Sequence, residues 1–491
     1  MIPAILLLLP LWAFSLNNEK PVRLNVVAEL NLGESRVIEL INGDTVNLAL
    51  LGINVVRDSP RQAVRAVYLH IAVDGEEITI GSGNYNLPVT IGKVQIDCPL
   101  IREHTTSSYY RHGESFMKDA RFRLWPEDSP WIQPGTFVYP LKQKWFASRM
   151  QSQNEPAGLG WAENLEARPV GYHPTHDFGG AEGLDEIISA TDGLIVSSGN
   201  KILEQYAELP GDVRPDVVWV VDERGWYYRY SHLNSTEPDI VPGAGIRKGQ
   251  KIGYMGKQGG SGGWVHLHFG VHYRDPVTSG WEVEDAWPYL WEAYVDKHNP
   301  PLKAVARPRH LLWTGQEATL DGTKSISLTG DIVSYEWLFH DGTPARGPVQ
   351  KKRYEKAGEF SAVLKVTDSK GNVDYDVVYL QVYDREHPEK QIPTIHPVYY
   401  PSLDIKPGDP VTFLVRTFGS ETGQEIWDFG DGSEKVAVNS GVVKRQTQNE
   451  GKYAETVHSF QKPGHYIVRV ERTNEYGFTA VGHLYVLVYD P

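Results

Sequence analysis

The stretch that decides the fold opens with Gly171-Tyr-His-Pro-Thr-His-Asp-Phe-Gly-Gly180 and closes with Trp264-Val-His-Leu-His-Phe-Gly270. A third segment, Tyr230-Ser-His-Leu233, lies between them in an aromatic-rich, strand-like run. The opening segment places His173 and Asp177 four residues apart. The proline and glycines of this segment show that it cannot form the interior of a helix. These three segments together hold the side chains from which a reactive site can be built.

The closing segment alternates, which predicts a strand with His266 and His268 on one face. Together with His173, Asp177 and His232, this pair predicts a metal site with a base beside it. A catalytic zinc takes three His, Asp or Glu ligands and keeps a fourth position for water. One member of the pair would join His173 and Asp177 as a ligand. Strand residues two positions apart are separated by about 7 Å, so the other can face the same pocket as a general base or charge stabiliser.

The stretch from about Pro169 to Leu290 resembles the lysostaphin-type (LytM-like) zinc metalloendopeptidases. Their pattern is His-x-x-x-Asp, Ala-x-Asp-Gly, Tyr-x-His-Leu, Gly-rich turns and then His-x-His. The chain has matching segments in the same order: His173-x-x-x-Asp177, Ala190-Thr-Asp-Gly193, Tyr230-Ser-His-Leu233, Lys248-Gly-Gln-Lys-Ile-Gly253 and His266-Leu-His268-Phe269.

The resemblance implies one Zn²⁺ per chain, held by His173, Asp177 and His268. It implies that His232 and His266 are the catalytic histidines and that no other cofactor is bound. The implied reaction is hydrolysis of a peptide bond, usually in bacterial wall cross-links. We expect His266 to be the general base and His232 to stabilise the oxyanion, although these two roles can be exchanged.

Two features depart from the family pattern. His176 competes with His173 as a metal ligand, and the four-residue spacing to Asp177 favours His173. The segment 179–186 and the insertion 204–215 are expected to lengthen loops beside the groove. They leave the choice of substrate open.

The fold class that we predict is mainly β, in several domains, because 491 residues are too many for one. Alternating runs such as Val67-Tyr-Leu-His-Ile-Ala-Val73 favour an N-terminal β domain, which we expect to be a sandwich. The peptidase family fold is an antiparallel sheet with a narrow groove. The expected parts are a signal peptide at 1–16, the N-terminal β domain at 21–140, the zinc peptidase domain at 155–298 and two Ig-like β-sandwiches at 303–385 and 393–491.

The two C-terminal modules form a weak repeat that resembles PKD-type Ig-like domains. The second carries Trp427-Asp-Phe-Gly-Asp-Gly432, and the first carries the looser Trp337-Leu-Phe-His-Asp-Gly342. In this type the Trp packs in the core and the Asp-Gly pair makes a tight turn. Asp428 and Asp431 are therefore interpreted as turn residues rather than calcium ligands. Such modules are expected to bind polysaccharide or protein, or to hold the enzyme away from a surface.

The remaining features concern location and partners. Residues 1–15 form a Pro-interrupted apolar run too short to span a membrane and are interpreted as a secretory signal. The single cysteine, Cys98, excludes an intrachain disulfide and favours a buried core residue. The formal net charge of -14 argues against nucleic acid as a partner. We therefore expect a secreted, periplasmic or cell-surface protein with no membrane span in the mature chain.

The function that we expect is that of a zinc endopeptidase acting on peptidoglycan or another extended peptide. A non-hydrolytic wall-binding or activator protein with the same fold remains open, and a missing ligand would indicate it. An adhesin whose sandwiches carry the function is a further alternative. Deleting residues 303–491 is expected to separate these classes, because an autonomous enzyme would still cut soluble peptides.

Overall fold

The computed structural model describes residues 20–83, 85–105, 116–144, 173, 175–276, 278–443 and 450–490. The predicted signal peptide and the beginning of the predicted peptidase domain, 155–172, lie outside the described residues. Strands dominate the fold, so the prediction of a mainly β protein is confirmed. Within the described ranges, helical structure is limited to α1 (Arg102–Thr105), α2 (Trp287–His298) and the short 3-10 turn η1 (Glu204–Tyr206). No helix in this part of the chain is long and apolar enough to cross a membrane.

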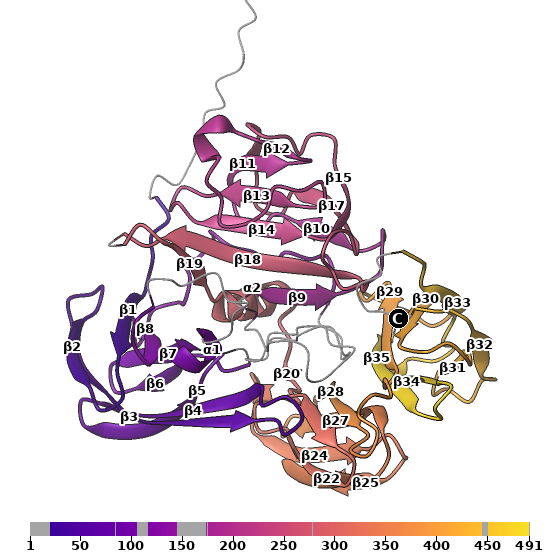
Figure 1. Cartoon of the computed structure of the whole chain (residues 1–491). Coiled ribbons are helices and arrows are strands. Elements are labelled where there is room, and N and C mark those ends of the chain that lie inside the picture. The colour runs from indigo at the N-terminus through magenta and orange to yellow at the C-terminus, as the bar shows by residue number, and fades with distance from the viewer. Residues whose placement is uncertain are drawn as a thin grey trace, which may run out of the picture.

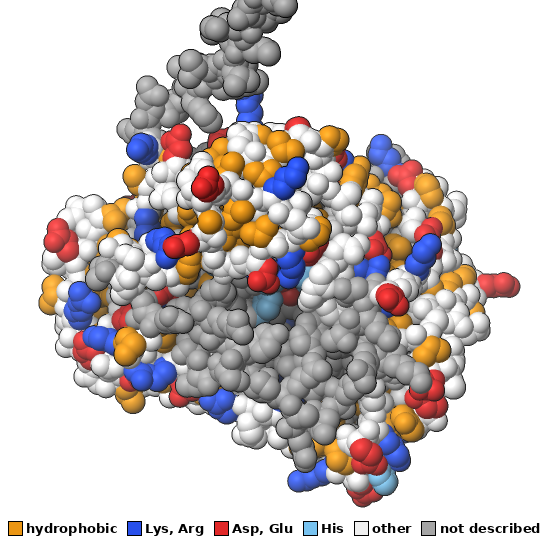
Figure 2. Space-filling view, turned by 45° about the horizontal axis from the view of Figure 1, so that its top comes forward, with side chains coloured by type: hydrophobic (Ala, Val, Ile, Leu, Met, Phe, Trp, Pro, Cys, Tyr) orange, Lys and Arg blue, Asp and Glu red, His pale blue; other side chains and the backbone are white. Residues whose placement is uncertain are grey.

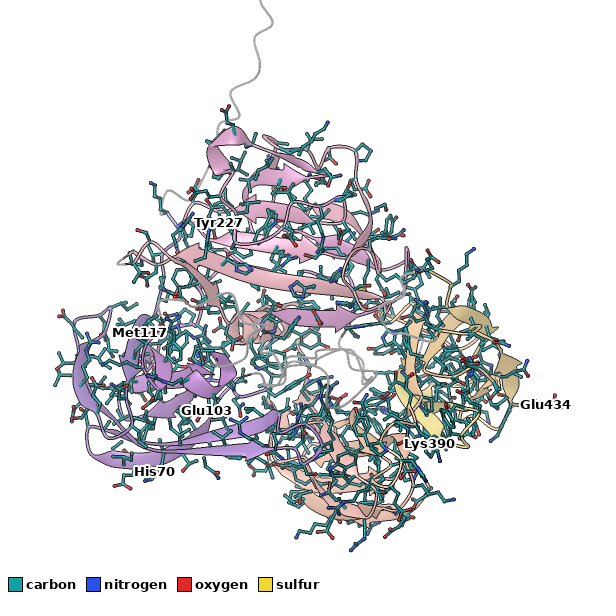
Figure 3. The ribbon with its side chains drawn as sticks, viewed as in Figure 1. His70, Glu103, Met117, Tyr227, Lys390 and Glu434 are labelled. Atoms are coloured by element: carbon teal, nitrogen blue, oxygen red, sulfur yellow. The ribbon has the colours of Figure 1, made fainter. Side chains whose placement is uncertain are left out.

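The N-terminal domain consists of two four-stranded antiparallel sheets that bury a shared apolar core. Cys98 is 1% exposed in this core, and burial raises its pKa to about 12, as expected for an inert core thiol. Figure 3 shows His70 on the outer side of the domain, where its Nε2 lies 2.9 Å from Glu77. The strands, in sheet order, are β2 (Ser35–Glu39), β3 (Thr45–Arg57), β4 (Val64–Val73) and β5 (Glu76–Gly81), then β1 (Val26–Leu30), β8 (Ala120–Pro126), β7 (Val94–Ile101) and β6 (Val89–Ile91).

The predicted peptidase domain is organised around one large antiparallel sheet. Its main path is β12 (Lys201–Ile202), β11 (Gly193–Ser198), β13 (Val218–Val221), β14 (Tyr227–Ser231), β18 (His266–Arg274) and β19 (Trp281–Glu284). Two further strands join it, β16 (Gly245–Ile246) on β11 and β9 (His176–Gly179) on β18. A three-stranded sheet of β10 (Glu186–Ile188), β17 (Lys251–Met255) and β15 (Leu233–Thr236) lies in the same domain. Helix α2 contributes Trp287, Tyr289 and Leu290 to the core of this domain.

The C-terminal modules are β-sandwiches, and their predicted core residues are buried: Trp337 is 2% exposed and Trp427 is 0% exposed. The first contains β20 (Leu302–Lys303), β21 (His310–Trp313), β22 (Gln316–Asp321), β23 (Ile326–Ser327), β24 (Ile332–Leu338), β25 (Pro344–Arg346), β26 (Val349–Tyr354), β27 (Gly358–Asp368) and β28 (Val373–Tyr383). The second contains β29 (Thr394–Tyr400), β30 (Val411–Phe418), β31 (Glu425–Asp428), β32 (Val436–Val438), β33 (Ala454–His458), β34 (Gly464–Thr473) and β35 (Thr479–Val488). Strand β27 pairs in parallel with β35, so one continuous sheet joins the two sandwiches.

The Asp-Gly pairs of both sandwiches form tight turns, as predicted. Gly342 and Gly432 have φ values of +80° and +86°, a conformation that favours glycine. Asp431 Oδ1 accepts the backbone N–H of Ser433 at 3.0 Å, which is the contact of an Asx turn. The interpretation of Asp431 as a turn residue therefore agrees with its contacts.

The predicted peptidase domain contacts the N-terminal domain and the second sandwich (Figure 1). Two arginines of the N-terminal domain form ion pairs with β19. The guanidinium of Arg121 lies 2.7 Å from the carboxylate of Glu282, and that of Arg123 lies 2.7 Å from the carboxylate of Glu284. On the opposite side, the second sandwich lies beside the beginning of β18. Other domains thus contact the central sheet at its β19 edge and near the beginning of β18.

Candidate metal centre

The candidate site is built where β9 pairs with β18. In this antiparallel pair His268 lies directly opposite Asp177, so their side chains share one face. Phe269 is fully buried in the core on the other face. Because neighbouring strand residues alternate, this fixes His268 on the opposite, site-bearing face. His173 lies in the segment that precedes β9.

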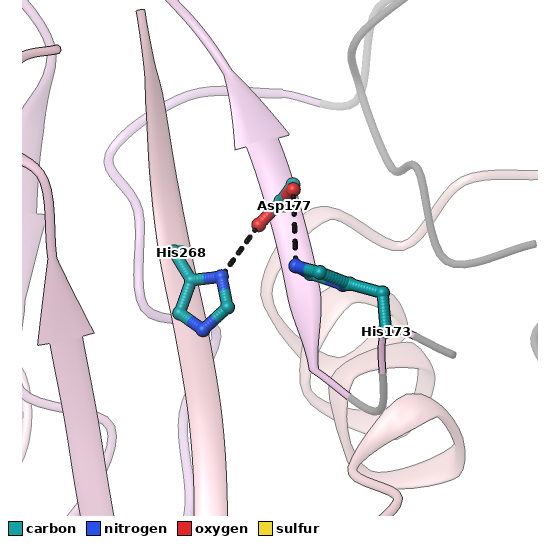
Figure 4. A group of neighbouring side chains, drawn as sticks. All are labelled: His173, Asp177 and His268. Carbon is teal, nitrogen blue, oxygen red and sulfur yellow. Dashed lines mark hydrogen bonds and ion pairs between the residues drawn. The ribbon is translucent and has the colours of Figure 1, made fainter. Parts of the chain in front are cut away.

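These three side chains converge (Figure 4). The Nδ1 atom of His268 lies 3.0 Å from Asp177 Oδ1, and the Nε2 atom of His173 lies 3.5 Å from Asp177 Oδ2. One ligand atom from each residue lies within 4.8 Å of the others. Two imidazole nitrogens and one carboxylate oxygen are the donors that a catalytic zinc takes, so the residues fit that ion.

The surroundings favour a neutral imidazole at His268. Burial lowers the pKa of His268 well below its usual value, and the nearby Arg229 cation adds to the effect. A histidine must be unprotonated at the nitrogen that binds a metal. The hydroxyl of Thr175 lies 3.1 Å from His268 Nε2 and 3.4 Å from His173 Nδ1, so Thr175 contacts both rings. The sequence reasoning did not single out Thr175.

The structure places both proposed catalytic histidines beside the cluster. His266 is 3% exposed, and its Nε2 lies 3.7 Å from Asp177 Oδ1. The rings of His232 and His266 have centroids 4.6 Å apart. Burial lowers the pKa of His266 well below its usual value, with Asp177 opposing this and His232 reinforcing it. His266 is therefore neutral near pH 7.

Both rings are oriented by backbone carbonyls at Nδ1. His266 Nδ1 lies 3.1 Å from the carbonyl oxygen of Trp264, and His232 Nδ1 lies 2.6 Å from that of Gln258. A carbonyl can only accept, so Nδ1 carries the proton in each ring. In His266, which burial keeps neutral, this leaves Nε2 as the basic nitrogen.

Asp216 supports His232 and was missed by the sequence reasoning. Its Oδ2 accepts the backbone N–H of His232 at 3.3 Å and lies 3.6 Å from His232 Nδ1. His232 has a φ of +67°, which is uncommon outside glycine and turns the residue away from β14. Arg214 binds the same carboxylate with two hydrogen bonds, at 3.0 and 2.9 Å. No sequence spacing marked Asp216, because it meets His232 only through the fold.

His176, the competing ligand, points away from the cluster. It is 1% exposed, its Nε2 lies 3.3 Å from Asp285 Oδ1, and its ring stacks on Trp287. It pairs with Phe269 in the β9–β18 register, which puts it on the core side. The geometry therefore favours His173 over His176.

Two family models match parts of this chain. The family model described as Peptidase family M23 matches residues 171–279. Residues 171–279 are a peptidase family M23 domain. The model described as PKD domain matches residues 298–382, so the M23 domain is followed by a PKD domain. The matched module is the first sandwich, which has the looser tryptophan signature.

Individual relatives match parts of the chain. Collagenase ColA of Clostridium perfringens (strain 13 / Type A) is 31% identical over 86 residues, which is 18% of this chain and 8% of the collagenase. The PKD1 domain of the Vibrio cholerae metalloprotease PrtV is 30% identical, covering 16% of this chain and 93% of that domain with a TM-score of 0.14. Helicobacter pylori Csd3 is 17% identical, covering 53% of this chain and 58% of Csd3 with a TM-score of 0.21. The match thus spans less than a tenth of the length of this collagenase.

Proposed function

We propose that this protein is a secreted zinc metalloendopeptidase that hydrolyses peptide bonds in peptidoglycan cross-links. The observation that carries the proposal is the convergence of His173, Asp177 and His268 beside two further histidines within an M23 domain. When bound by these three residues, Zn²⁺ would polarise the scissile carbonyl and lower the pKa of a bound water.

The buried His266 is the proposed general base. Its Nδ1 proton is engaged by the carbonyl of Trp264, so its Nε2 can accept a proton from the attacking water. Because burial keeps the ring neutral, the base is available near pH 7. After the attack, the same nitrogen can return the proton to the leaving amine.

His232 is the proposed stabiliser of charge that develops on the substrate. The carboxylate of Asp216 stands beside its Nδ1 edge, and a carboxylate in that position stabilises positive charge on an imidazole. A positively charged ring would donate from Nε2 to the oxyanion. The roles of His232 and His266 can still be exchanged, because both rings present Nε2.

The substrate assignment rests on the M23 match and on access to the site. The side chain of His173 is 33% exposed, so the cluster can be reached from solvent. Figure 2 shows histidine at the surface near the centre of the face drawn. We propose an extended peptide of the bacterial wall as the substrate, and polysaccharide or protein as the ligand of the PKD-type modules. A non-hydrolytic wall-binding protein would be favoured by a missing ligand, whereas His173, Asp177 and His268 are all in place.

Incubation of the full-length, zinc-loaded protein with purified peptidoglycan tests the proposal. Released peptides are identified by mass spectrometry, with and without a zinc chelator. We expect cleavage that the chelator abolishes and that Asp177→Ala lacks. The matched control is His70→Gln, a change at an outer-surface imidazole. A zinc-loaded protein that binds walls but releases no peptide would overturn the proposal in favour of the binding protein.

A further inference from the structure

Trp264 contacts His266 in two ways. It lies two positions before His266, the first residue of β18, and its side chain lies on the imidazole of His266 with ring centroids 3.5 Å apart and planes 16° apart. Its own carbonyl oxygen lies 3.1 Å from His266 Nδ1. One residue therefore contacts both the face and the Nδ1 edge of the proposed base.

The second sandwich covers Trp264. Phe418, at the end of β30, and Val443 form one buried apolar cluster with Trp264, which is only 5% exposed. His396 of β29 meets the indole edge-on, with centroids 5.3 Å apart. Figure 1 shows the same neighbourhood, with β29 and β30 beside the beginning of β18. Trp264 thus bridges His266 and a separate domain.

Polar contacts fix the backbone on both sides of Trp264. Arg416, which is fully buried, donates from its guanidinium to the carbonyl oxygen of Gly263 at 2.5 Å. The backbone N–H of Val265 donates to the hydroxyl of Tyr453 at 3.0 Å. That hydroxyl lies 2.5 Å from His396 Nδ1. The residues before and after Trp264 are therefore both anchored to the second sandwich.

We infer that the second sandwich, residues 393–490, is part of the scaffold of the peptidase site and fixes the orientation of His266 through Trp264. Trp264 is a positioning residue, since it acts on the reaction only through His266. A general base must be aimed at the proton it accepts, and a misplacement of about 1 Å can cost about 10²-fold in rate. The effect on rate rests on the proposed function, whereas the stack itself does not.

A truncation that removes both sandwiches also removes the contacts that hold Trp264. Removing residues 303–491 would remove Phe418 and His396 from Trp264, and Tyr453 from the adjacent Val265. A truncated chain that fails to cut peptides would therefore not identify the sandwiches as an adhesin. The test must use point variants of the full chain.

Four variants of the full-length, zinc-loaded protein separate positioning from general damage. We expect Trp264→Ala to lower kcat by about 10²-fold, with KM within about threefold and zinc retained. Trp264→Phe keeps an aromatic face, so its kcat should stay within about fivefold of that of the unmodified protein. In Phe418→Ala, kcat should fall by about tenfold. The matched control is Trp281→Ala on β19, whose ring instead packs against Tyr227, the residue labelled in Figure 3.

A spectroscopic readout does not depend on cleavage. Histidine labelled with ¹³C at Cε1 reports ring stacking by NMR, and His266→Gln assigns the signal. We expect an upfield-shifted His266 signal that moves downfield in Trp264→Ala and, in part, in Phe418→Ala.

The outcomes are distinguishable. A Trp264→Ala variant that folds, holds zinc and keeps the kcat of the unmodified protein would overturn the inference. If circular dichroism shows that Trp264→Ala does not fold, the kcat values of Trp264→Phe and Phe418→Ala test the inference instead. If the unmodified protein cuts no peptide, the proposed function fails. The His266 signal then decides the inference alone, and an unchanged signal in Phe418→Ala would overturn it.

Discussion

Replacing Asp216 by Asn is expected to slow peptide hydrolysis by roughly 10- to 100-fold without removing zinc. Asp216 Oδ2 lies 3.6 Å from Nδ1 of His232, the proposed stabiliser of the oxyanion. Burial alone would raise the pKa of Asp216, but hydrogen bonds from His232 and Arg214 lower it well below its usual value. The carboxylate is therefore charged at neutral pH and faces any positive charge that develops on His232.

The magnitude follows from this distance. Two unit charges 3.6 Å apart attract each other by about 4.6 kcal/mol at an effective dielectric constant of about 20. Arg214 binds the same carboxylate at 2.9 Å and offsets part of its field. We therefore expect about 1.5 to 3 kcal/mol of transition-state stabilisation to be lost, which corresponds to roughly 10- to 100-fold in kcat.

The assay measures kcat on a purified wall peptide and zinc content by elemental analysis. The matched control is Asp212→Asn, which removes a carboxylate from the same loop at a side chain that is 76% exposed. The control should keep its activity within about twofold, because surface charges contribute little. If Asp216→Asn also retained kcat within twofold while holding zinc, the reasoning about His232 would be refuted.

Three further changes test other parts of the account. His266→Gln should keep zinc and lose about 10²- to 10⁴-fold in kcat, because it removes the general base; an active variant would exclude that role. Burial raises the pKa of Asp185 from 3.8 to about 7, so its stabilising contribution is complete below about pH 4 and is lost as the pH rises to about 7. Melting temperatures measured from pH 4 to 8 should therefore fall more in the unmodified protein than in Asp185→Asn, and parallel curves would contradict this. Trp427→Ala should lower the free energy of unfolding of the second sandwich by about 3 to 5 kcal/mol, measured by denaturant titration, and a change below about 1 kcal/mol would show that this core tolerates the loss.

The parts of the site that the sequence could predict are local. The alternation of His266 and His268 and the spacing of His173 to Asp177 follow from strand geometry and from the family pattern. The β9–β18 register then brings His268 opposite Asp177, which is 91 residues away in sequence, and the prediction that these two residues meet came from the family pattern. The same alternation explains why His176 faces the core.

The remaining features depend on contacts between segments far apart in sequence. Asp216 reaches His232 because the backbone turns at a positive φ, which no motif encodes. Trp264 acquires its role from Phe418, a residue of another domain. The parallel pairing of β27 with β35, which joins the two sandwiches, also lay beyond any local pattern. A single sequence carries no signal for such pairings, because each partner alone resembles an ordinary core residue.

Zinc stoichiometry tests the central claim most directly. Elemental analysis of the purified full-length protein and of His268→Ala, after dialysis against metal-free buffer, measures the ion bound per chain. Because His268, Asp177 and His173 place one donor atom each within 4.8 Å, we expect about one zinc per chain in the unmodified protein and a loss of that zinc in the variant. A protein that holds no zinc after incubation with excess metal, or a variant that keeps its zinc, would contradict the account.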